Sequence, residues 1–216
     1  MTTHLPKLYC LTSDNVSVSH SHQVLKFCEA GVRFIQLRSK SLSKIEMLAE
    51  VRESVRISRR FQAKLIVNDS IEVAIESDAD GVHLGRADKD IADARKFLGE
   101  TKVIGFTIHS ENEITEDVLC NANYIGMGPF RKSKTKTDLS PTLSIDDYCT
   151  MIQRLDPMPV FLIGGMDIED FSLSLRLANH GIAVCSALSE QENLNISKIK
   201  AFVDESAKHD FVEACF

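Results

Sequence analysis

The chain has 216 residues, of which 44% are hydrophobic and 26% charged, and its net charge is −6. A chain of this length buries enough apolar surface to fold without disulfides, and its six cysteines show no metal-finger spacing. The negative charge disfavours nucleic acid and membrane surfaces as partners, because polyanions are repelled. The sequence contains no basic segment leading into an apolar run, and no stretch of the roughly 18 apolar residues that span a bilayer, so a cytoplasmic location is expected.

Short apolar runs predict eight strands, with longer segments of helical spacing between them. The predicted strands cover residues 7–12, 33–37, 64–67, 81–84, 102–107, 124–127, 160–163 and 181–185, and the clearest helix covers 44–60. Strands this apolar are typical of a parallel sheet covered by helices. Eight repeats predict an α/β fold, a single (β/α)8 TIM barrel forming one domain over residues 1–216, with the barrel at about 7–208. An open Rossmann-like sheet is the alternative, disfavoured because no GxGxxG follows the first strand.

Polar residues follow almost every predicted strand, and in a barrel these positions converge on one rim, where active sites are built. Asn68 and Asp69 follow the third strand, and Asp88 follows the fourth. Two carboxylates from neighbouring strand ends suit Mg²⁺, which prefers carboxylate oxygens and completes its shell with water and phosphate. The alternative is that each aspartate is the N-cap of the helix that begins there.

Cationic and polar side chains follow the second and sixth strands. Gln36, Arg38 and Lys40 alternate along an extended segment, so their side chains share one face. The amide suits the edge of a heterocycle, and the two cations suit a phosphate. A second cationic run, residues 131–136, is expected to close over an anion as a lid. For both runs, a solvated surface loop is the alternative.

The seventh and eighth strands end in small residues. Gly164 and Gly165 follow the seventh strand and Ser186 follows the eighth, as in the phosphate cradles of α/β barrels, although a tight turn explains the glycine pair equally well. His83, inside the fourth strand, is interpreted as a hydrogen-bonded core histidine. His109, just past the fifth, is a candidate general base or ligand to a substrate ring.

These features predict two anion sites on one rim, one magnesium-assisted and cationic, the other built from backbone amides. Two phosphorylated small molecules that are joined with loss of diphosphate would use both sites. Such a reaction requires no nucleophilic side chain. The expected contribution of the chain to catalysis is therefore electrostatic, from Arg38, Lys40 and Lys136.

The motifs form an ordered set from about residue 7 to residue 188. They are QLRSK at 36–40, VND at 67–69, DGVHLGRAD at 80–88, IGFTIH at 104–109, YIGMGPF at 124–130, SKTK at 133–136, IGGM at 163–166 and GIAVCSA at 181–187. This set resembles the thiamine-phosphate synthase (thiamine-phosphate pyrophosphorylase) family. The resemblance implies a transferase of thiamine biosynthesis that joins 4-amino-2-methyl-5-(diphosphomethyl)pyrimidine to a thiazole phosphate. Diphosphate would leave first, in a Mg-assisted dissociative substitution that gives thiamine phosphate.

The resemblance also implies roles by position. Asp69 and Asp88 would bind magnesium. The pyrimidine diphosphate would be held by Gln36, Arg38, Lys40, Asn68, Thr107 and Lys136, and the thiazole phosphate by Ser133, Thr135, Gly165, Cys185 and Ser186; His109 is a further substrate-binding candidate. The chain departs from the family pattern at Arg86, Thr107, Ser133 and Cys185 and in the stretch after Lys136, so most departures lie on the thiazole side and in the lid.

Three alternatives stay open. Thiazole tautomerases share the barrel and are the nearest relatives of the family, but they tend to lack the paired aspartates. A non-catalytic barrel that binds a thiamine precursor predicts phosphate binding without turnover. An unrelated barrel isomerase or decarboxylase would usually want a Lys or Glu base in the barrel interior. A homodimer stays open as an alternative to a monomer.

Overall fold

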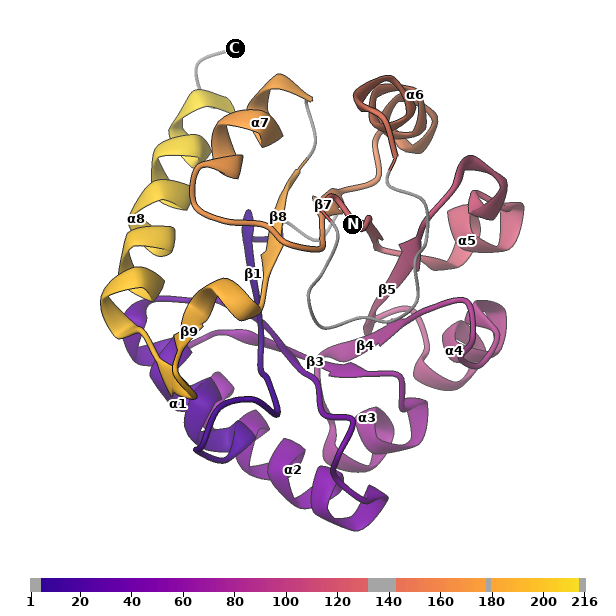
Figure 1. The fold of residues 1–216 in the computed structure, drawn as a ribbon. Helices are drawn as coiled ribbons and strands as arrows, with labels where there is room; N and C mark the ends of the chain where they lie inside the picture. The colour runs from indigo at the N-terminus through magenta and orange to yellow at the C-terminus, as the bar shows by residue number, and fades with distance from the viewer. Residues whose placement is uncertain (1–4, 132–142, 178–179, 214–216) are drawn as a thin grey trace.

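The computed structural model describes residues 5–131, 143–177 and 180–213, and its eight parallel strands close into a barrel (Figure 1). The strands are β1 (Leu8–Leu11), β2 (Phe34–Leu37), β3 (Lys64–Asn68), β4 (Gly81–Leu84), β5 (Val103–Ile108), β6 (Tyr124–Met127), β7 (Val160–Leu162) and β8 (Gly181–Val184). They follow one another in chain order, and β8 pairs with β1 where Tyr9 lies opposite Ala183. The predicted TIM barrel is confirmed, and each predicted strand end lies within one residue of the observed end.

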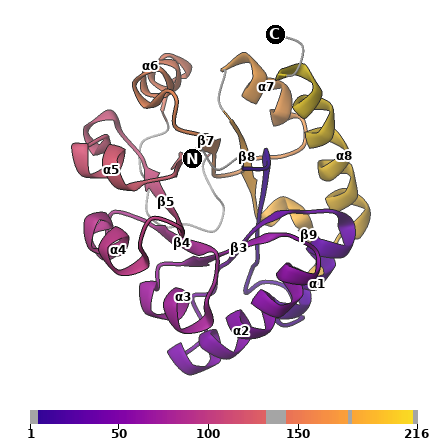
Figure 2. The ribbon, with the colours of Figure 1, turned by 180° about the vertical axis from the view of Figure 1, so that it is seen from behind.

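Helices form a ring outside the barrel in both views (Figures 1 and 2). They are α1 (His20–Ala30), α2 (Lys44–Arg60), α3 (Ile71–Ser77), α4 (Ile91–Leu98), α5 (Glu116–Asn121), α6 (Ile145–Leu155), α7 (Asp170–Arg176) and α8 (Ile196–Glu213), with short 3-10 turns η1 (Glu111–Glu113) and η2 (Ser186–Leu188). The helix predicted over 44–60 is α2, which begins with a capping box between Ser43 and Glu46. Within the described ranges, no helix combines the length and apolar character needed to cross a bilayer.

The alternation of side chains along the strands produces two apolar layers. One lies inside the barrel, where Tyr9, Phe34, Tyr124 and Phe161 pack with ring centroids 4.1 to 5.6 Å apart. The other lies between strands and helices and includes residues such as Val51 of α2. Tyr9, Phe34 and Tyr124 lie in the first half of their strands and Phe161 in the middle of β7, so most of these rings fill the barrel towards its amino end.

A β-hairpin that the sequence pattern did not predict separates β8 from α8. Its strands β9 (Ser189–Glu190) and β10 (Asn193–Leu194) pair antiparallel across Gln191 and Glu192, whose φ angles are 47° and 65°. Positive φ at both turn positions is the geometry of a type I′ turn, which suits the twist of a two-residue hairpin. The backbone N–H of Ser17 donates to the Glu192 carbonyl, so the hairpin is tied to the loop after β1.

Candidate functional site

The carboxyl ends of the strands bring most of the predicted residues to one rim. Asn68 ends β3 directly beside His83 of β4, and Thr107 of β5 lies beside Gly126 of β6. Gln36 lies one residue from the end of β2. The predicted lid residues Ser133, Thr135 and Lys136 lie outside the described residues.

Asp69 and Asp88 form a pair of interacting carboxylates. Partial removal of Asp69 from water, together with the charge of Asp88 and a hydrogen bond to it, raises the pKa of Asp69 from 3.8 to about 6. The cations Arg38 and Lys40 act in the opposite direction, which shows that they lie near the pair. Asp69 also has φ 63°, a left-handed conformation that costs free energy in a residue other than glycine and is often found at functional sites.

The helices after β3 and β4 are capped by other residues. The side chain of Ser70 accepts from the Val73 N–H at the start of α3, and Asp90 accepts from two backbone N–H groups at the start of α4. The alternative that Asp69 and Asp88 are the N-caps is therefore wrong. Asp88 instead accepts the Gly85 N–H at 2.7 Å, which holds its carboxylate across the loop after β4.

The carboxylate pair fits a hard divalent cation. Repulsion between two carboxylates is what a bound cation relieves, and Mg²⁺ is often held by one or two carboxylates while water and substrate phosphates complete its shell. Within the described part of the chain, no group of three or more His, Cys, Asp or Glu side chains gathers for a metal. Asp69 and Asp88 therefore suit an ion whose remaining ligands come from a phosphate and from water.

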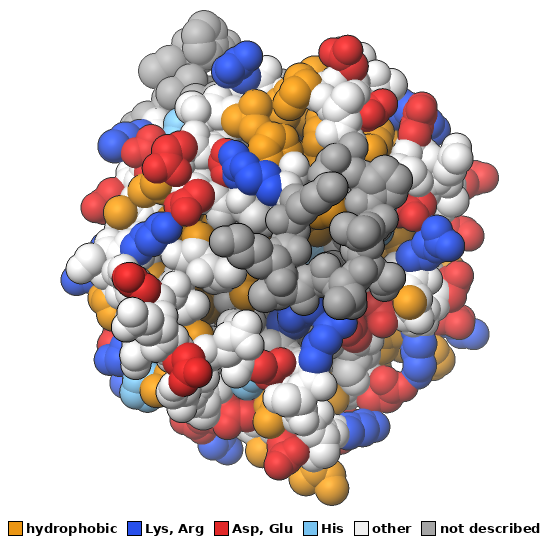
Figure 3. All heavy atoms as spheres, in the orientation of Figure 1, with side chains coloured by type: hydrophobic (Ala, Val, Ile, Leu, Met, Phe, Trp, Pro, Cys, Tyr) orange, Lys and Arg blue, Asp and Glu red, His pale blue; other side chains and the backbone are white. Residues whose placement is uncertain are grey.

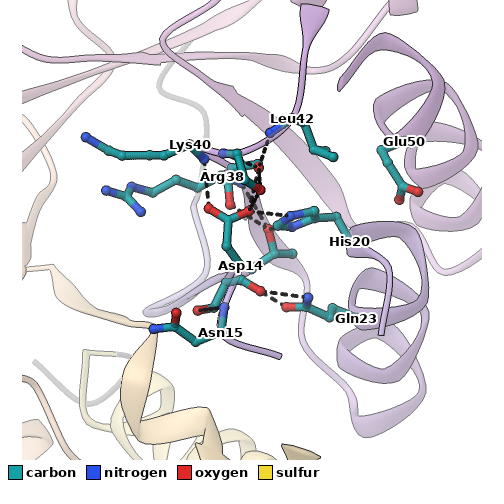
Figure 4. A network of polar contacts seen from close by, with 12 residues as sticks. Asp14, Asn15, His20, Gln23, Arg38, Lys40, Leu42 and Glu50 are labelled. Atoms are coloured by element: carbon teal, nitrogen blue, oxygen red, sulfur yellow. Dashed lines mark hydrogen bonds and ion pairs between the residues drawn. The ribbon is translucent and has the colours of Figure 1, made fainter. Parts of the chain in front are cut away.

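Asp14, in the loop after β1, holds the segment that carries Arg38 and Lys40 (Figure 4). Its carboxylate accepts from the hydroxyls of Ser39 and Ser41 at 2.5 and 2.9 Å and from the Lys40 N–H at 2.8 Å. Burial opposes ionisation, but these hydrogen bonds and one to His20 lower the pKa of Asp14 to about 2. The segment of residues 39–41 is thus hydrogen-bonded to the ionised carboxylate of Asp14 at neutral pH.

A second contact joins the same two loops. The hydroxyl of Thr12 accepts the Arg38 N–H at 3.0 Å and also lies 2.8 Å from Nδ1 of His20. His20 reaches Asp14 through its other ring nitrogen, at 3.1 Å. Figure 4 shows the side chains of Arg38 and Lys40 extending in the same direction from this fastened backbone. Asp14 was not among the predicted site residues, although it follows the first strand just as Asp69 and Asp88 follow the third and fourth.

A chain of hydrogen bonds crosses the barrel interior from β2 to β5. Nε2 of Gln36 donates to the Tyr9 hydroxyl at 2.7 Å, and the hydroxyls of Tyr9 and Tyr124 lie 2.7 Å apart. Nδ1 of His83 lies 2.9 Å from the Tyr124 hydroxyl, and its Nε2 lies 2.7 Å from the Thr107 hydroxyl. Burial lowers the pKa of His83 to about 4, so its ring is neutral at neutral pH. The interpretation of His83 as a hydrogen-bonded core histidine agrees with these contacts.

His109 connects the loops after β5 and β6. Its backbone N–H donates to Glu113 at 2.7 Å, and Nδ1 of its ring contacts the Gly128 carbonyl oxygen. Glu113 also pairs with Arg86 at 3.4 Å. These contacts account for the position of the ring, while a role as base or substrate ligand stays a prediction.

The side of the rim built from β7 and β8 has a different construction. Gly164 and Gly165 both have positive φ, 89° and 69°. Gly165 and Ser186 line a cavity of about 490 Å³, whose wall also includes Lys198 at the start of α8. Nζ of Lys198 pairs with Asp167 at 2.9 Å. Sequence reasoning missed Lys198 because it lies in a helix, far from any strand end.

Two further residues lie near this side of the rim. Burial raises the pKa of the Cys185 thiol, which lies 3.8 Å from the Thr12 carbonyl oxygen. Arg131 donates to both oxygens of Asp170 at 2.6 Å and so joins the segment after β6 to the start of α7.

Figure 3 shows side chains of both charges mixed over the face seen in Figure 1, with Lys and Arg side chains near its centre.

Comparisons with known proteins agree with the motifs. Residues 8–188 match the model of the family described as thiamine monophosphate synthase. The thiamine-phosphate synthase of Flavobacterium psychrophilum is 35% identical over 174 residues, which cover 79% of this chain and 84% of the relative. That of Flavobacterium johnsoniae is 32% identical over 194 residues, which cover 88% and 92%.

A solved structure agrees with these relatives. Thiamine phosphate pyrophosphorylase from Pyrococcus furiosus has a TM-score of 0.81 and 25% identity, and the match covers 94% of this chain and 96% of that one. The segment matched by the family model includes every strand of the barrel, from β1 to β8. The chain therefore belongs to the thiamine monophosphate synthase family, a family of transferases, as its motifs predicted.

Proposed function

We propose that this chain is a thiamine-phosphate synthase that joins 4-amino-2-methyl-5-(diphosphomethyl)pyrimidine to a thiazole phosphate. The bond between the pyrimidine methylene carbon and the diphosphate oxygen would break, with its electron pair leaving on the diphosphate. The thiazole nitrogen would then give its lone pair to the methylene carbon, so the products are thiamine phosphate and diphosphate. The curated relatives carry this name, and their similarity extends over most of the chain.

The observation that carries the proposal is that Arg38 and Lys40 lie near enough to the interacting carboxylates of Asp69 and Asp88 to lower the pKa of Asp69. A departing diphosphate gains negative charge, and groups fixed in place before the reaction stabilise that charge without reorganising. Arg38 can bind phosphate oxygens through two donors, and Lys40 supplies a point charge. The contacts of Thr12 and Asp14 hold the backbone that carries both cations before substrate arrives.

Magnesium bound by Asp69 and Asp88 would supply Lewis-acid stabilisation of the diphosphate. Without a cation, the two carboxylates would repel an approaching diphosphate. A bound Mg²⁺ ion would therefore explain why two aspartates lie at a site for an anion. Gly165, Ser186 and Lys198 line the cavity in which we place the second substrate's phosphate.

Incubation of the protein with both substrates and Mg²⁺, followed by measurement of thiamine phosphate and diphosphate, tests the proposal. We expect the two products in equal amounts and no product when EDTA removes the metal. Binding of both substrates without product would contradict the proposal and favour the non-catalytic barrel that binds a thiamine precursor. Conversion of a thiazole phosphate to its tautomer without coupling would favour the tautomerase.

A further inference from the structure

The interior chain of hydrogen bonds connects two residues at the rim through residues that lie deeper in the barrel. Gln36 is level with Leu11 in β1, so Tyr9 lies two residues nearer the amino end. At the other side, His83, Gly105 and Tyr124 are level with one another, and Thr107 lies two residues nearer the carboxyl end. The series of hydrogen bonds therefore runs from Gln36 towards the amino end of the barrel and crosses the interior between the two tyrosines. It then returns towards the carboxyl end through His83 to Thr107.

The barrel makes room for this chain with two glycines. A methyl group at Gly105 would collide with the ring and hydroxyl of Tyr124 and with Nδ1 of His83. At Gly126 it would lie 3.3 Å from the Thr107 hydroxyl and 3.4 Å from a carbon of the His83 ring, closer than most carbon contacts allow. A side chain at Gly105 would displace Tyr124 and His83, and one at Gly126 would press against Thr107 and His83.

The number of hydrogens requires all four hydrogen bonds to run in the same direction, and the donor role of Gln36 Nε2 sets which direction that is. The chain has four links, but the Tyr9 and Tyr124 hydroxyls and the neutral His83 ring supply only three hydrogens. One end must supply the fourth, so one end donates into the chain and the other accepts from it. With Nε2 of Gln36 donating, each tyrosine hydroxyl donates onward, and Nε2 of His83 donates to Thr107.

This direction determines what the two ends offer to a ligand. Oε1 of Gln36 has no partner within the described part of the chain, so it is available as an acceptor. The Thr107 hydroxyl accepts from His83 and keeps its own hydrogen to donate. To reverse the pattern, the Gln36 amide would have to flip and all four hydrogen bonds would have to change direction together. The chain thus couples an acceptor at β2 to a donor at β5.

We propose that Tyr9, Tyr124 and His83 are positioning residues that make the site select an aminopyrimidine over an oxopyrimidine. The inference rests on the proposed function, which supplies the pyrimidine. An aminopyrimidine has an amine that donates and ring nitrogens that accept, so its different sides can pair with an acceptor at Gln36 and a donor at Thr107. The oxo ring carries an oxygen that accepts in place of the amine, and one of its ring nitrogens carries a hydrogen that donates. A buried site that hydrogen-bonds one pattern rejects the other because its own polar groups are left unpaired.

The test compares Kd values for the aminopyrimidine diphosphate and its 4-oxo analogue, measured by calorimetry with Mg²⁺ and without the thiazole phosphate. Tyr124→Phe removes the central hydroxyl and lets the two ends orient independently. We expect the Kd for the 4-oxo analogue divided by the Kd for the aminopyrimidine diphosphate to fall by about tenfold, a change worth ~1.4 kcal/mol. Tyr9→Phe removes the hydroxyl that joins Gln36 to Tyr124 and is expected to lower the same ratio.

Tyr148→Phe is the matched control, since its buried hydroxyl has no hydrogen-bond partner within the described residues. It should leave the ratio unchanged, and thermal unfolding of all variants shows whether each one folds. An unchanged ratio in a folded Tyr124→Phe or Tyr9→Phe protein would overturn the inference even if the wild-type protein makes thiamine phosphate. A lowered ratio supports it even if no product forms, so failure of the inference and failure of the proposed function are distinguishable.

Discussion

The two sides of the rim are built in different ways. At β2 to β4, charged side chains gather, and hydrogen bonds to Asp14 and Thr12 fix the backbone that carries Arg38 and Lys40. At β7 and β8, the cavity is lined by Gly165, by polar residues such as Ser186, by the acids Asp167 and Glu190, and by Lys198, which already pairs with Asp167. The first side is a group of charged side chains on a backbone that hydrogen bonds hold in place, whereas the second side is mainly a cavity.

The proposed reaction explains why the β2 to β4 side and the β7 and β8 side of the rim differ. The diphosphate gains charge as its bond to carbon breaks, so fixed cations on that side stabilise the transition state more than the bound substrate. The phosphate of the thiazole keeps the same charge throughout, so groups around it contribute to binding and little to the rate. Substitutions on the two sides should therefore change different kinetic constants.

The largest effect is expected from Asp88→Ala. Loss of one carboxylate weakens the cation site, and we expect kcat/KM to fall on the order of 100-fold, ~2.7 kcal/mol, with little remaining dependence on Mg²⁺. Asp90→Ala is the control, because Asp90 lies two residues away and caps α4. That control should lose about 1 kcal/mol of stability while its magnesium dependence persists. If Asp88→Ala unfolds the barrel instead, its main role is structural.

Asp14→Asn tests the fastening of the cationic segment. The variant loses the charged acceptor of three hydrogen bonds, so we expect KM for the pyrimidine diphosphate to rise about tenfold, with a smaller change in kcat. KM for the thiazole phosphate should not change. Asn15→Ala is the control, since the hydrogen bond shown for Asn15 uses its backbone N–H. Equal changes in both KM values would mean that the two sides are not independent.

Lys198→Ala tests the opposite side. We expect KM for the thiazole phosphate to rise about threefold to tenfold, as for loss of one partly solvated charge, with kcat and KM for the pyrimidine diphosphate unchanged. Lys200→Ala removes the same charge from an exposed position of α8 and should have no effect. A fall in kcat for Lys198→Ala would show that this lysine acts on the reaction itself.

The smallest effect concerns acid stability. The pKa of Asp14 is about 2 in the folded protein and 3.8 ordinarily, so its stabilising contribution is present above pH 3.8 and is lost as the pH falls towards 2. Asp14→Asn should therefore be less stable than the wild type at about pH 5, and this difference should shrink at about pH 2.5 in urea unfolding. A difference that stays constant with pH would contradict the lowered pKa.

Much of this molecule follows from local pattern. The eight strands and α2 were predicted nearly to the residue, because apolar runs and helical spacing are properties of short segments. The rule that polar residues at strand ends meet at one rim also led to Asp69, Asp88 and Arg38. It would have led to Asp14 too, had it been applied to the first strand.

Other features depend on residues far apart in the chain. The caps at Ser70 and Asp90 could not be separated from the neighbouring aspartates, because each helix start offers several capping residues and only the backbone path chooses among them. The β9–β10 hairpin is too short to leave a periodic signal. Lys198 reaches the rim only because α8 begins beside it.

The sequence by itself determined the barrel, the family and the type of chemistry expected at the rim, because these rest on periodicity and on short motifs in a fixed order. Only the tertiary structure decided how the groups act together. The chain from Gln36 to Thr107 depends on the register of β1, β2, β4, β5 and β6, and the contacts of Asp14 join segments 25 to 27 residues apart. Hydrogen bonds require distances of about 3 Å, and no local pattern sets such distances between separate strands.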